Sequence, residues 1–231
     1  MVSFNFHQTK IHLTELGDAT MQDSKSYTGV LKRNKLAEPK IIYEMNQVHG
    51  KNVIDLKEDI VYPSKLPACD GLITDRRNTA LMIKTADCLP IIMTSEAKPV
   101  IAALHAGWKG LSAGIHLGGI SKLDSLWNLL PKQIFVYIGP SIQSCCYVFE
   151  DKPTQAGDVK WQPYISRKKD GWHIDLPGFA KAGLISAGVP AGHITDSGEC
   201  TCHESNTYFS YVRHKNTQSP MGLCATVVQL R

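Results

Sequence analysis

Short apolar runs, separated by polar and turn-forming residues, dominate the chain between residues 41 and 138. Each run has the length and composition of a β-strand. The predicted strands are Ile41–Met45, Asn52–Leu56, Ala80–Lys84, Pro90–Thr94, Val100–Leu104 and Gln133–Ile138. In the tail, Tyr208–Tyr211 and Cys224–Leu230 are expected to be two closing strands around a loop. Residues 1–40 are polar and uneven and predict turns, and residues 150–169 predict an irregular polar segment.

Two segments show the spacing of helices instead. After Gly110, apolar residues recur at intervals of three and four until Pro131 ends the pattern. A second helix is expected to begin near Asp175, a suitable N-cap residue, and to stop at Gly188. Strands interleaved with helices predict a mixed α/β (α+β) fold, in which layers of mixed β-sheet are flanked by helices. Because no repeat or linker divides the chain, residues 1–231 are interpreted as a single domain.

Composition and charge narrow the class of protein. The 231 residues include 25 Lys and Arg against 21 Asp and Glu, and the net charge of +4 is not clustered as in a nucleic-acid-binding protein. The longest apolar runs are far shorter than the ~20 residues that cross a bilayer. The chain has an odd number of cysteines, seven, and its N-terminal residues do not form a secretory signal pattern. We therefore expect reduced thiols and a cytoplasmic protein without a nucleic-acid or membrane partner.

Three residues with metal-binding side chains follow predicted strands closely: His49, Cys88 and His105. If the strands share one sheet and one direction, their ends place two imidazoles and a thiol at the same edge. This donor set matches a catalytic zinc site whose fourth position stays open. Taken singly, each residue is better explained as a buried structural residue. Taken together, the shared placement makes the metal and the structural interpretations about equal.

The other cysteines give weaker signals. Cys69, Cys145 and Cys224 are predicted to be structural, with neither a metal nor a disulfide, and the pair Cys145-Cys146 is expected in the core. The segment Cys200-Thr-Cys202-His203 contains metal-binding residue types. A strand would simply place its two thiols on one face, so a structural or incidental role is favoured.

Several blocks of sequence resemble the YfiH-type family, also called the laccase-domain family. They are Asn46-Gln47-Val48-His49-Gly50, Cys69-Asp70-Gly71, Thr85-Ala86-Asp87-Cys88-Leu89-Pro90, His105-Ala106-Gly107-Trp108-Lys109-Gly110 and Gly139-Pro140-Ser141-Ile142. The blocks occur in the family's order between Asn46 and Val148, and Phe209-Ser210-Tyr211 adds a later match. The resemblance implies an α/β domain with zinc bound by His49, Cys88 and His105.

The resemblance also implies a purine nucleoside enzyme. Family members are described as phosphorylases of adenosine, inosine and methylthioadenosine that also deaminate adenosine, and others as polyphenol oxidases or peptidoglycan-precursor editing hydrolases. The catalytic candidates are then His49, Cys88, His105 and Asp87, the last either moving protons or only holding a turn. The candidate substrate-binding residues, for nucleoside and phosphate, are Asn46, Lys109 and Arg213. Trp108 could stack on a base or simply pack.

The chain departs from the family pattern where arginines are expected. The Arg-x-Gly-Gly block near the start is absent, Val212 stands in the family's Ser-Tyr-Arg-Arg run, and Leu223 replaces the Arg of a Gly-Arg pair. Because forked guanidinium groups hold phosphate best, these changes weaken the case for phosphorolysis more than the case for zinc. A hydrolase acting on a peptidoglycan precursor and a non-catalytic zinc-binding homologue therefore remain alternatives.

An oxidase is disfavoured on the histidines alone. Multicopper chemistry needs many imidazoles, usually in His-x-His pairs, and none of the nine histidines forms such a pair. A blue-copper site needs two His and one Cys with a weak axial Met. Met93 lies five residues after Cys88, but no histidine lies between them. Zinc is thus preferred to copper, and laccase activity is not expected as the main function.

Overall fold

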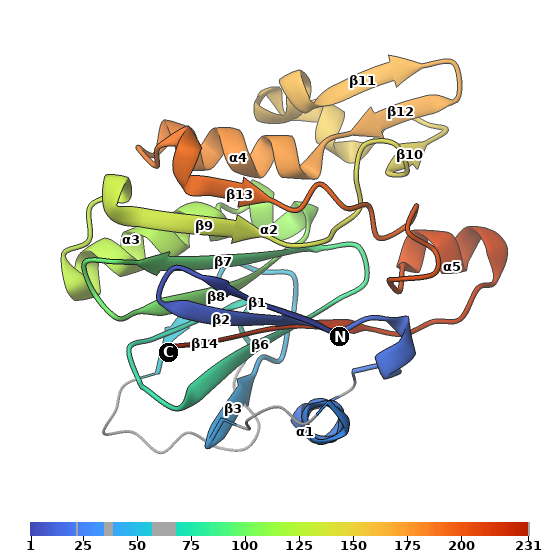
Figure 1. Ribbon diagram of the computed structural model, residues 1–231. Helices are drawn as coiled ribbons and strands as arrows, with labels where there is room; N and C mark the ends of the chain where they lie inside the picture. Colours follow the sequence, from blue (N-terminus) through green and yellow to red (C-terminus); the bar gives the residue numbers. More distant parts are fainter. Residues whose placement is uncertain (22, 35–38, 57–67, 231) are drawn as a thin grey trace.

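Two β-sheets stack face to face in the computed structural model, and helices cover their outer faces (Figure 1). The model describes residues 1–21, 23–34, 39–56 and 68–230. The five-stranded sheet runs, in spatial order, β1 (Val2–Phe6), β2 (Thr9–Leu13), β14 (Cys224–Leu230), β6 (Thr79–Thr85) and β3 (Ile41–Glu44). The six-stranded sheet runs β13 (Ile194–Asp196), β9 (Ile134–Ile138), β7 (Leu89–Ser95), β8 (Ile101–Ala106), β5 (Gly71–Thr74) and β4 (Val53–Asp55).

The remaining elements lie around these sheets. A small three-stranded sheet is formed by β10 (Val148–Phe149), β12 (Gly171–Ile174) and β11 (Ile165–Lys168). The α-helices are α1 (Ser24–Arg33), α2 (Trp108–Ser112), α3 (Ile115–Trp127), α4 (Leu176–Ser186) and α5 (Tyr211–Thr217). None of the helices in the described part of the chain is long and apolar enough to span a membrane.

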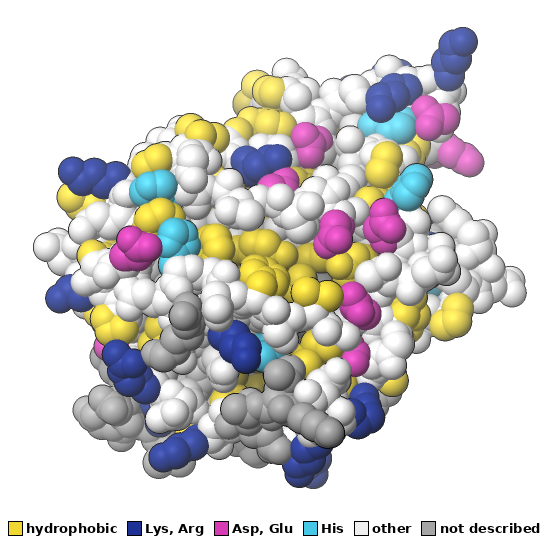
Figure 2. Space-filling model, viewed as in Figure 1, with side chains coloured by type: hydrophobic (Ala, Val, Ile, Leu, Met, Phe, Trp, Pro, Cys, Tyr) yellow, Lys and Arg dark blue, Asp and Glu magenta, His cyan; other side chains and the backbone are white. Residues whose placement is uncertain are grey.

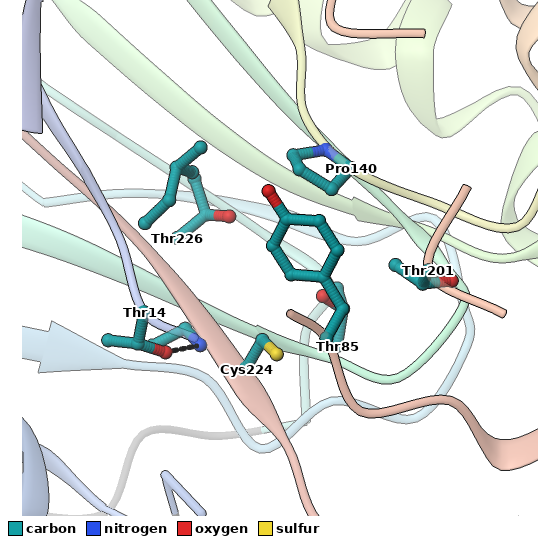
Figure 3. Close-up of a pocket in the computed structure, with 9 residues that line it drawn as sticks. Thr14, Thr85, Pro140, Thr201, Cys224 and Thr226 are labelled. Atoms are coloured by element: carbon teal, nitrogen blue, oxygen red, sulfur yellow. Dashed lines mark hydrogen bonds between the residues drawn. The ribbon is translucent and has the colours of Figure 1, made fainter. Parts of the chain in front are cut away.

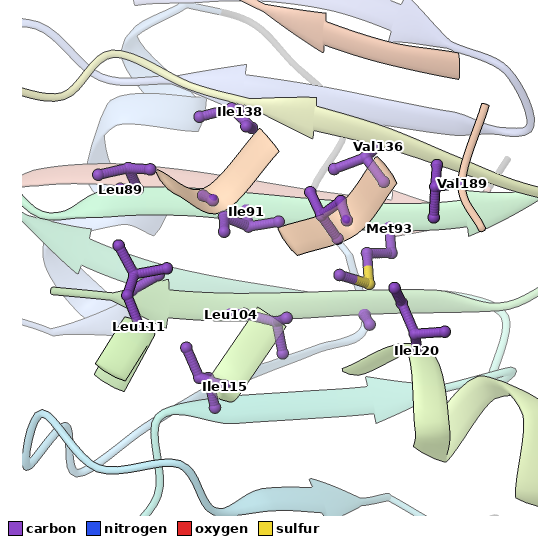
Figure 4. Close-up of a cluster of buried hydrophobic side chains, with 14 of the residues drawn as sticks. Leu89, Ile91, Met93, Leu104, Leu111, Ile115, Ile120, Val136, Ile138 and Val189 are labelled. Atoms are coloured by element: carbon purple, nitrogen blue, oxygen red, sulfur yellow. The ribbon is translucent and has the colours of Figure 1, made fainter. Parts of the chain in front are cut away.

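The continuous apolar runs of the central strands reflect burial on both faces. Because side chains alternate along a strand, Ile91 and Met93 of β7 point toward α3 and α4 (Figure 4). Ile92, between them, points into the layer between the two sheets. In β6, Leu81 faces the inter-sheet layer and Met82 packs with α1 on the opposite face. The result is four layers in the order helix, sheet, sheet, helix.

The predicted fold class is confirmed, as are most of the predicted strands. Each predicted strand between residues 41 and 138 coincides with an observed strand to within two residues at either end. The predicted N-cap is also confirmed, because the Asp175 side chain accepts a hydrogen bond from the Gly178 N–H at the start of α4. The helix predicted after Gly110 is divided at Gly114, whose positive φ separates α2 from α3.

Other predictions were wrong, and capping residues explain two of them. Residues 1–40 contain β1, β2 and α1 rather than turns alone. In the same way, Tyr208–Tyr211 is not a strand, since Ser210 is the N-cap of α5 and accepts from the Arg213 N–H. Asp23 caps α1 by accepting from the Ser26 N–H. Asp and Ser favour both turns and N-caps, so the sequence pattern did not separate them.

Residues 150–169 are also more regular than predicted, since β11 forms within them and pairs with β12. On the face of the molecule shown in Figure 2, Lys and Arg side chains are scattered and do not form a continuous basic stripe.

Candidate metal centre

His49, Cys88 and His105 are brought together by strands of two different sheets. His49 follows β3 of the five-stranded sheet, and His105 lies within β8 of the six-stranded sheet. Cys88 lies in the short connection by which the chain passes from β6 in one sheet to β7 in the other. The strands that precede these residues therefore do not share one sheet, as the sequence argument had assumed, although the three side chains do meet. They meet because this end of the molecule is where the two sheets are joined.

The pairing of β7 with β8 fixes the distance between two of these residues. In this antiparallel ladder Pro90 lies opposite His105 and Leu89 opposite Ala106, so Cys88, the residue before β7, lies beside the end of β8. One ligand atom from each of His49, Cys88 and His105 lies within 4.8 Å of the others. His105 is buried, Cys88 half-buried and His49 exposed, so the group is open to solvent on the His49 side. The donor set fits a zinc ion with an open fourth position.

Asp70 holds two of the three residues in place and was not identified as a site residue from the sequence. Its carboxylate is fully buried at the start of β5, and Oδ1 accepts from His105 Nδ1 at 2.7 Å. The same carboxylate accepts three backbone N–H groups of the His49 loop, from Val48, His49 and Gly50. Since a carboxylate only accepts, Nδ1 of His105 donates this bond, and Nε2 is the ring nitrogen left to bind a metal. This arrangement matches the carboxylate–histidine–metal triads of metalloproteins.

The electrostatics of the group also suit a cation. Partial burial lowers the pKa of His49, and the positive charges of His105 and Lys109 lower it against an opposing contribution from Asp70, which favours the neutral imidazole that a metal needs. Burial raises the pKa of Cys88 to about 12, and the negative charges of Asp87 and Asp70 act in the same direction. Burial works to raise the pKa of Asp70, but hydrogen bonds from His105 and Gly50 outweigh it, and that pKa is lowered. A thiol in such surroundings ionises readily only when a positive ion is bound to it.

Gly107 allows the backbone to approach the ligand atoms closely. A Cβ at this position would lie 2.9 Å from Cys88 Sγ and 3.1 Å from His49 Cδ2. The φ of Gly107 is −77°, which any residue can adopt, so only the close approach requires glycine.

Replacing Gly107 with Ala is therefore expected to displace Cys88 and His49 and to weaken zinc binding by on the order of tenfold or more. The measurement is a zinc titration of the variant against a chelator of known affinity. Gly118→Ala is the matched control, because the nearest atoms to its Cβ lie 4.0 Å away. Wild-type zinc affinity in Gly107→Ala would show that the ligands do not converge beside this glycine.

Asp87 lies next to Cys88 but directs its carboxylate elsewhere. Oδ1 accepts from the Thr201 hydroxyl at 2.7 Å, and Oδ2 accepts from the Val212 N–H at 2.8 Å. Its backbone carbonyl accepts from the Ile142 N–H, and its φ of 95° is unusual for a residue with a side chain. These bonds connect the Cys88 turn to the segments after β9 and β13. The role of Asp87 in moving protons stays a prediction, while its role in holding the turn is visible.

The three predicted substrate-binding residues lie in different surroundings. Lys109 is exposed, close enough to His49 to affect its pKa, and its Nζ lies 5.8 Å from the Trp108 ring centroid. Asn46 is exposed at the end of β3. The guanidinium of Arg213 donates to the carbonyl oxygens of Thr201, Cys202 and Tyr208. Arg213 thus holds the chain between β13 and α5 in place, and its contact with phosphate stays a prediction.

A small cavity lies behind this region, between the two sheets and Tyr208. Its volume is about 10 Å³, and its lining includes Thr14, Thr85, Thr201 and Cys224 (Figure 3). A space of this size holds a single water molecule at most, whereas small-molecule sites measure roughly 300–1,000 Å³. This cavity is therefore too small to hold a substrate.

The comparisons with known proteins identify the family of the chain. The family model described as "Multi-copper polyphenol oxidoreductase laccase" matches residues 8–231. The chain is 31% identical over 187 residues to the purine nucleoside phosphorylase YlmD of Geobacillus stearothermophilus, covering 76% of this chain and 68% of YlmD. It is 31% identical over 176 residues to the purine nucleoside phosphorylase YfiH of Escherichia coli strain K12, covering 75% of this chain and 69% of YfiH.

Solved structures show the same fold. The hypothetical protein YfiH of Bacillus licheniformis superposes with a TM-score of 0.82 at 24% identity, covering 97% of this chain and 93% of that chain. The fold, the family model over nearly the whole chain and the relatives above 30% identity lead to one conclusion: this chain belongs to the YfiH-type family.

Proposed function

We propose that this protein is a zinc-dependent purine nucleoside enzyme that phosphorolyses adenosine, inosine and methylthioadenosine and also deaminates adenosine. The observation that carries the proposal is the group formed by His49, Cys88 and His105, with Asp70 orienting His105 and solvent reaching the His49 side. The relatives named purine nucleoside phosphorylases support the substrate class.

The residues present fit a zinc ion as resident cofactor. Two neutral imidazoles and one thiolate are the ligands of known catalytic zinc sites, and the buried Asp70 carboxylate adds the partner that such histidines usually have. Zinc held there would supply a Lewis acid with one position free for substrate or water.

Trp108 and Lys109 are proposed to bind the substrates. They are the first two residues of α2 and come three and four residues after His105. Trp108 packs partly against the hydrophobic cluster under the six-stranded sheet, which fixes its indole and leaves part of it accessible. Its ring could stack on a purine, and Lys109 would attract phosphate as a point charge. In phosphorolysis a phosphate oxygen bonds to ribose C1′ while the bond from C1′ to the base breaks, so both ligands must reach this surface.

Phosphate binding is proposed to be weak. Lys109 lacks the forked donors of arginine, most donors of Arg213 are used by backbone carbonyls, and Val212 and Leu223 stand where the family has arginines. Each missing charged hydrogen bond costs about 1.5–3 kcal/mol, and every ~1.4 kcal/mol is a factor of ten in affinity. Deamination uses water and does not need these donors.

The test follows free base and inosine from the zinc-loaded enzyme, with adenosine and inosine as substrates, across a series of phosphate concentrations. We expect base release to need more than ~1 mM phosphate for half-saturation, the upper end of common KM values, while deamination is affected less. Lys109→Gln should raise the phosphate requirement further and leave bound zinc unchanged.

Two outcomes would contradict the proposal in different ways. Saturation of base release at micromolar phosphate would show that Lys109, Arg213 or backbone amides suffice and that the arginine argument is wrong. If no nucleoside gives a product while zinc is bound, the nucleoside assignment fails, and assays with nucleotide-linked peptidoglycan precursors become the next step.

A further inference from the structure

A second group of sulfur and nitrogen donors lies outside the metal centre described above. Cys145 and Cys146 occupy a turn that follows β9, and His203 occupies a turn that follows β13. β9 and β13 are parallel neighbours at one edge of the six-stranded sheet (Figure 1). The two turns therefore leave the same end of that sheet.

Hydrogen bonds hold the two segments side by side before any metal is considered. Ser141 and Cys200 form a parallel bridge, in which the Ser141 N–H donates to the Glu199 carbonyl and the Thr201 N–H donates to the Ser141 carbonyl. The Gln143 N–H donates to Cys200 Sγ at 3.4 Å. The positions of Cys145, Cys146 and His203 are thus fixed by backbone contacts on both sides.

The distances between the donors suit a single metal ion. Ligand atoms of Cys145, Cys146 and His203 all lie within 4.8 Å of one another, and the two sulfur atoms are 3.6 Å apart. Two thiolates bound tetrahedrally to one zinc, each at about 2.3 Å, would lie about 3.8 Å apart. A disulfide would instead need the sulfurs at about 2.05 Å, and both cysteines are free thiols.

The exposure of the group differs from what the sequence predicted for these cysteines. Cys145 is exposed and Cys146 half-buried, so the expectation that this pair lies in the core was wrong for Cys145. His203 is exposed as well, which leaves solvent access for an ion and for a fourth ligand. The exposed Cys145 gains no packing energy comparable to that of a buried thiol.

We propose that Cys145, Cys146 and His203 form a second metal site, which takes zinc or another divalent cation with affinity for sulfur. Thiolate and imidazole ligands select such ions over magnesium and calcium. The site is independent of His49, Cys88 and His105, with which it shares no ligand.

A metal at this position would cross-link the segments after β9 and β13. Those are the segments that hold Asp87, since Thr201 donates to its carboxylate and Ile142 donates to its carbonyl. The second ion would therefore stabilise the turn that carries Cys88 without touching a substrate.

The experiment measures zinc per chain after equilibration with excess zinc and dialysis against a weak chelator. We expect two zinc ions in the wild type, one in Cys88→Ser, one in Cys145→Ser and in His203→Gln, and none in the double variant Cys88→Ser/Cys145→Ser. Since Cys145 and His203 are exposed, their replacement is not expected to prevent folding. Cys202→Ser is the matched control, a thiol of the same turn outside the group, and should retain both ions.

Cobalt(II) gives a second measurement that does not depend on activity. Cobalt(II) bound to Cys88→Ser should show the charge-transfer absorption of two thiolates. This absorption should be weaker in the double variant Cys88→Ser/His203→Gln and weaker still in Cys88→Ser/Cys145→Ser. The melting temperature of Cys88→Ser should rise on adding zinc, and that of Cys88→Ser/Cys145→Ser should not.

Three results would overturn the proposal. The first is that the wild type binds only one zinc ion and that Cys88→Ser binds none. The second is that Cys145→Ser and His203→Gln each still bind two zinc ions. The third is a denatured, zinc-free protein with five free thiols in place of seven, which would indicate that Cys145 and Cys146 are oxidised to a disulfide.

Discussion

Cys88→Ala is expected to abolish zinc binding at the His49–Cys88–His105 site and to lower nucleoside turnover by about 10²–10³-fold or more, the usual cost of losing an electrostatic stabiliser. Cys88 is the only anionic ligand in that group, and it stands where the two sheets are joined. Two imidazoles without a thiolate form a much weaker site. Metal analysis and the nucleoside assay on one preparation measure both effects.

The control for this variant is Cys224→Ala. Cys224 is a buried thiol of β14 that accepts a hydrogen bond from the Phe209 N–H and belongs to neither metal-binding group. Its replacement is expected to cost some stability and to leave zinc content unchanged. Full zinc occupancy of the first site in Cys88→Ala would show that Cys88 is not a zinc ligand.

Asp70→Asn is expected to weaken zinc binding at the same site by about 10–100-fold, although Asp70 is not itself a ligand. The carboxylate accepts from donors on both oxygens, His105 Nδ1 and His49 N on one, and the N–H groups of Gly50 and Val48 on the other. Whichever way an Asn amide is turned, its NH₂ group faces donors. The His49 loop or the His105 ring must then move.

The exposed carboxylate Asp75 provides the control for this change. Asp75 accepts from Trp127 Nε1 at 3.0 Å, and an Asn oxygen can accept the same bond. Asp75→Asn should therefore bind zinc like the wild type. Equal zinc affinities for Asp70→Asn and Asp75→Asn would show that the carboxylate at position 70 does not orient His105.

The strands of the core could be predicted from the sequence because they are buried on both faces and appear as uninterrupted apolar runs. The runs containing Ile92 and Leu81 were recognised for this reason. The hairpin of β1 and β2 was missed because neither strand is an uninterrupted apolar run: polar residues alternate with apolar ones in β1, and a buried polar residue lies between the apolar ones of β2. Helix α1 was missed because its N-cap, Asp23, resembles a turn residue. In each case tertiary packing decided between conformations that the local sequence permits.

The candidate site was predicted in part. His49, Cys88 and His105 follow or end apolar strands, and this placement, with the family resemblance, identified them. Asp70 has a similar place before β5, but nothing in the sequence shows that it is fully buried or that it faces His105. The use of Arg213 by three carbonyls is likewise a property of the folded chain. Long-range hydrogen bonds of this kind have no local pattern.

The position of the metal-binding group at the junction of the two sheets has a consequence for assembly. His49 and Cys88 lie in the β3–β4 and β6–β7 connections, each of which joins the five-stranded sheet to the six-stranded sheet, and His105 lies in β8 of the six-stranded sheet. Two of the three donors are therefore carried by connections anchored in both sheets, and the geometry that brings all three together is complete only when both sheets are in place. Since a ligand that binds only the native state stabilises it, metal availability would set how firmly the two halves of the molecule are held together. Under the proposed function, a measured affinity for zinc would then report on the completion of the fold as well as on the catalytic site.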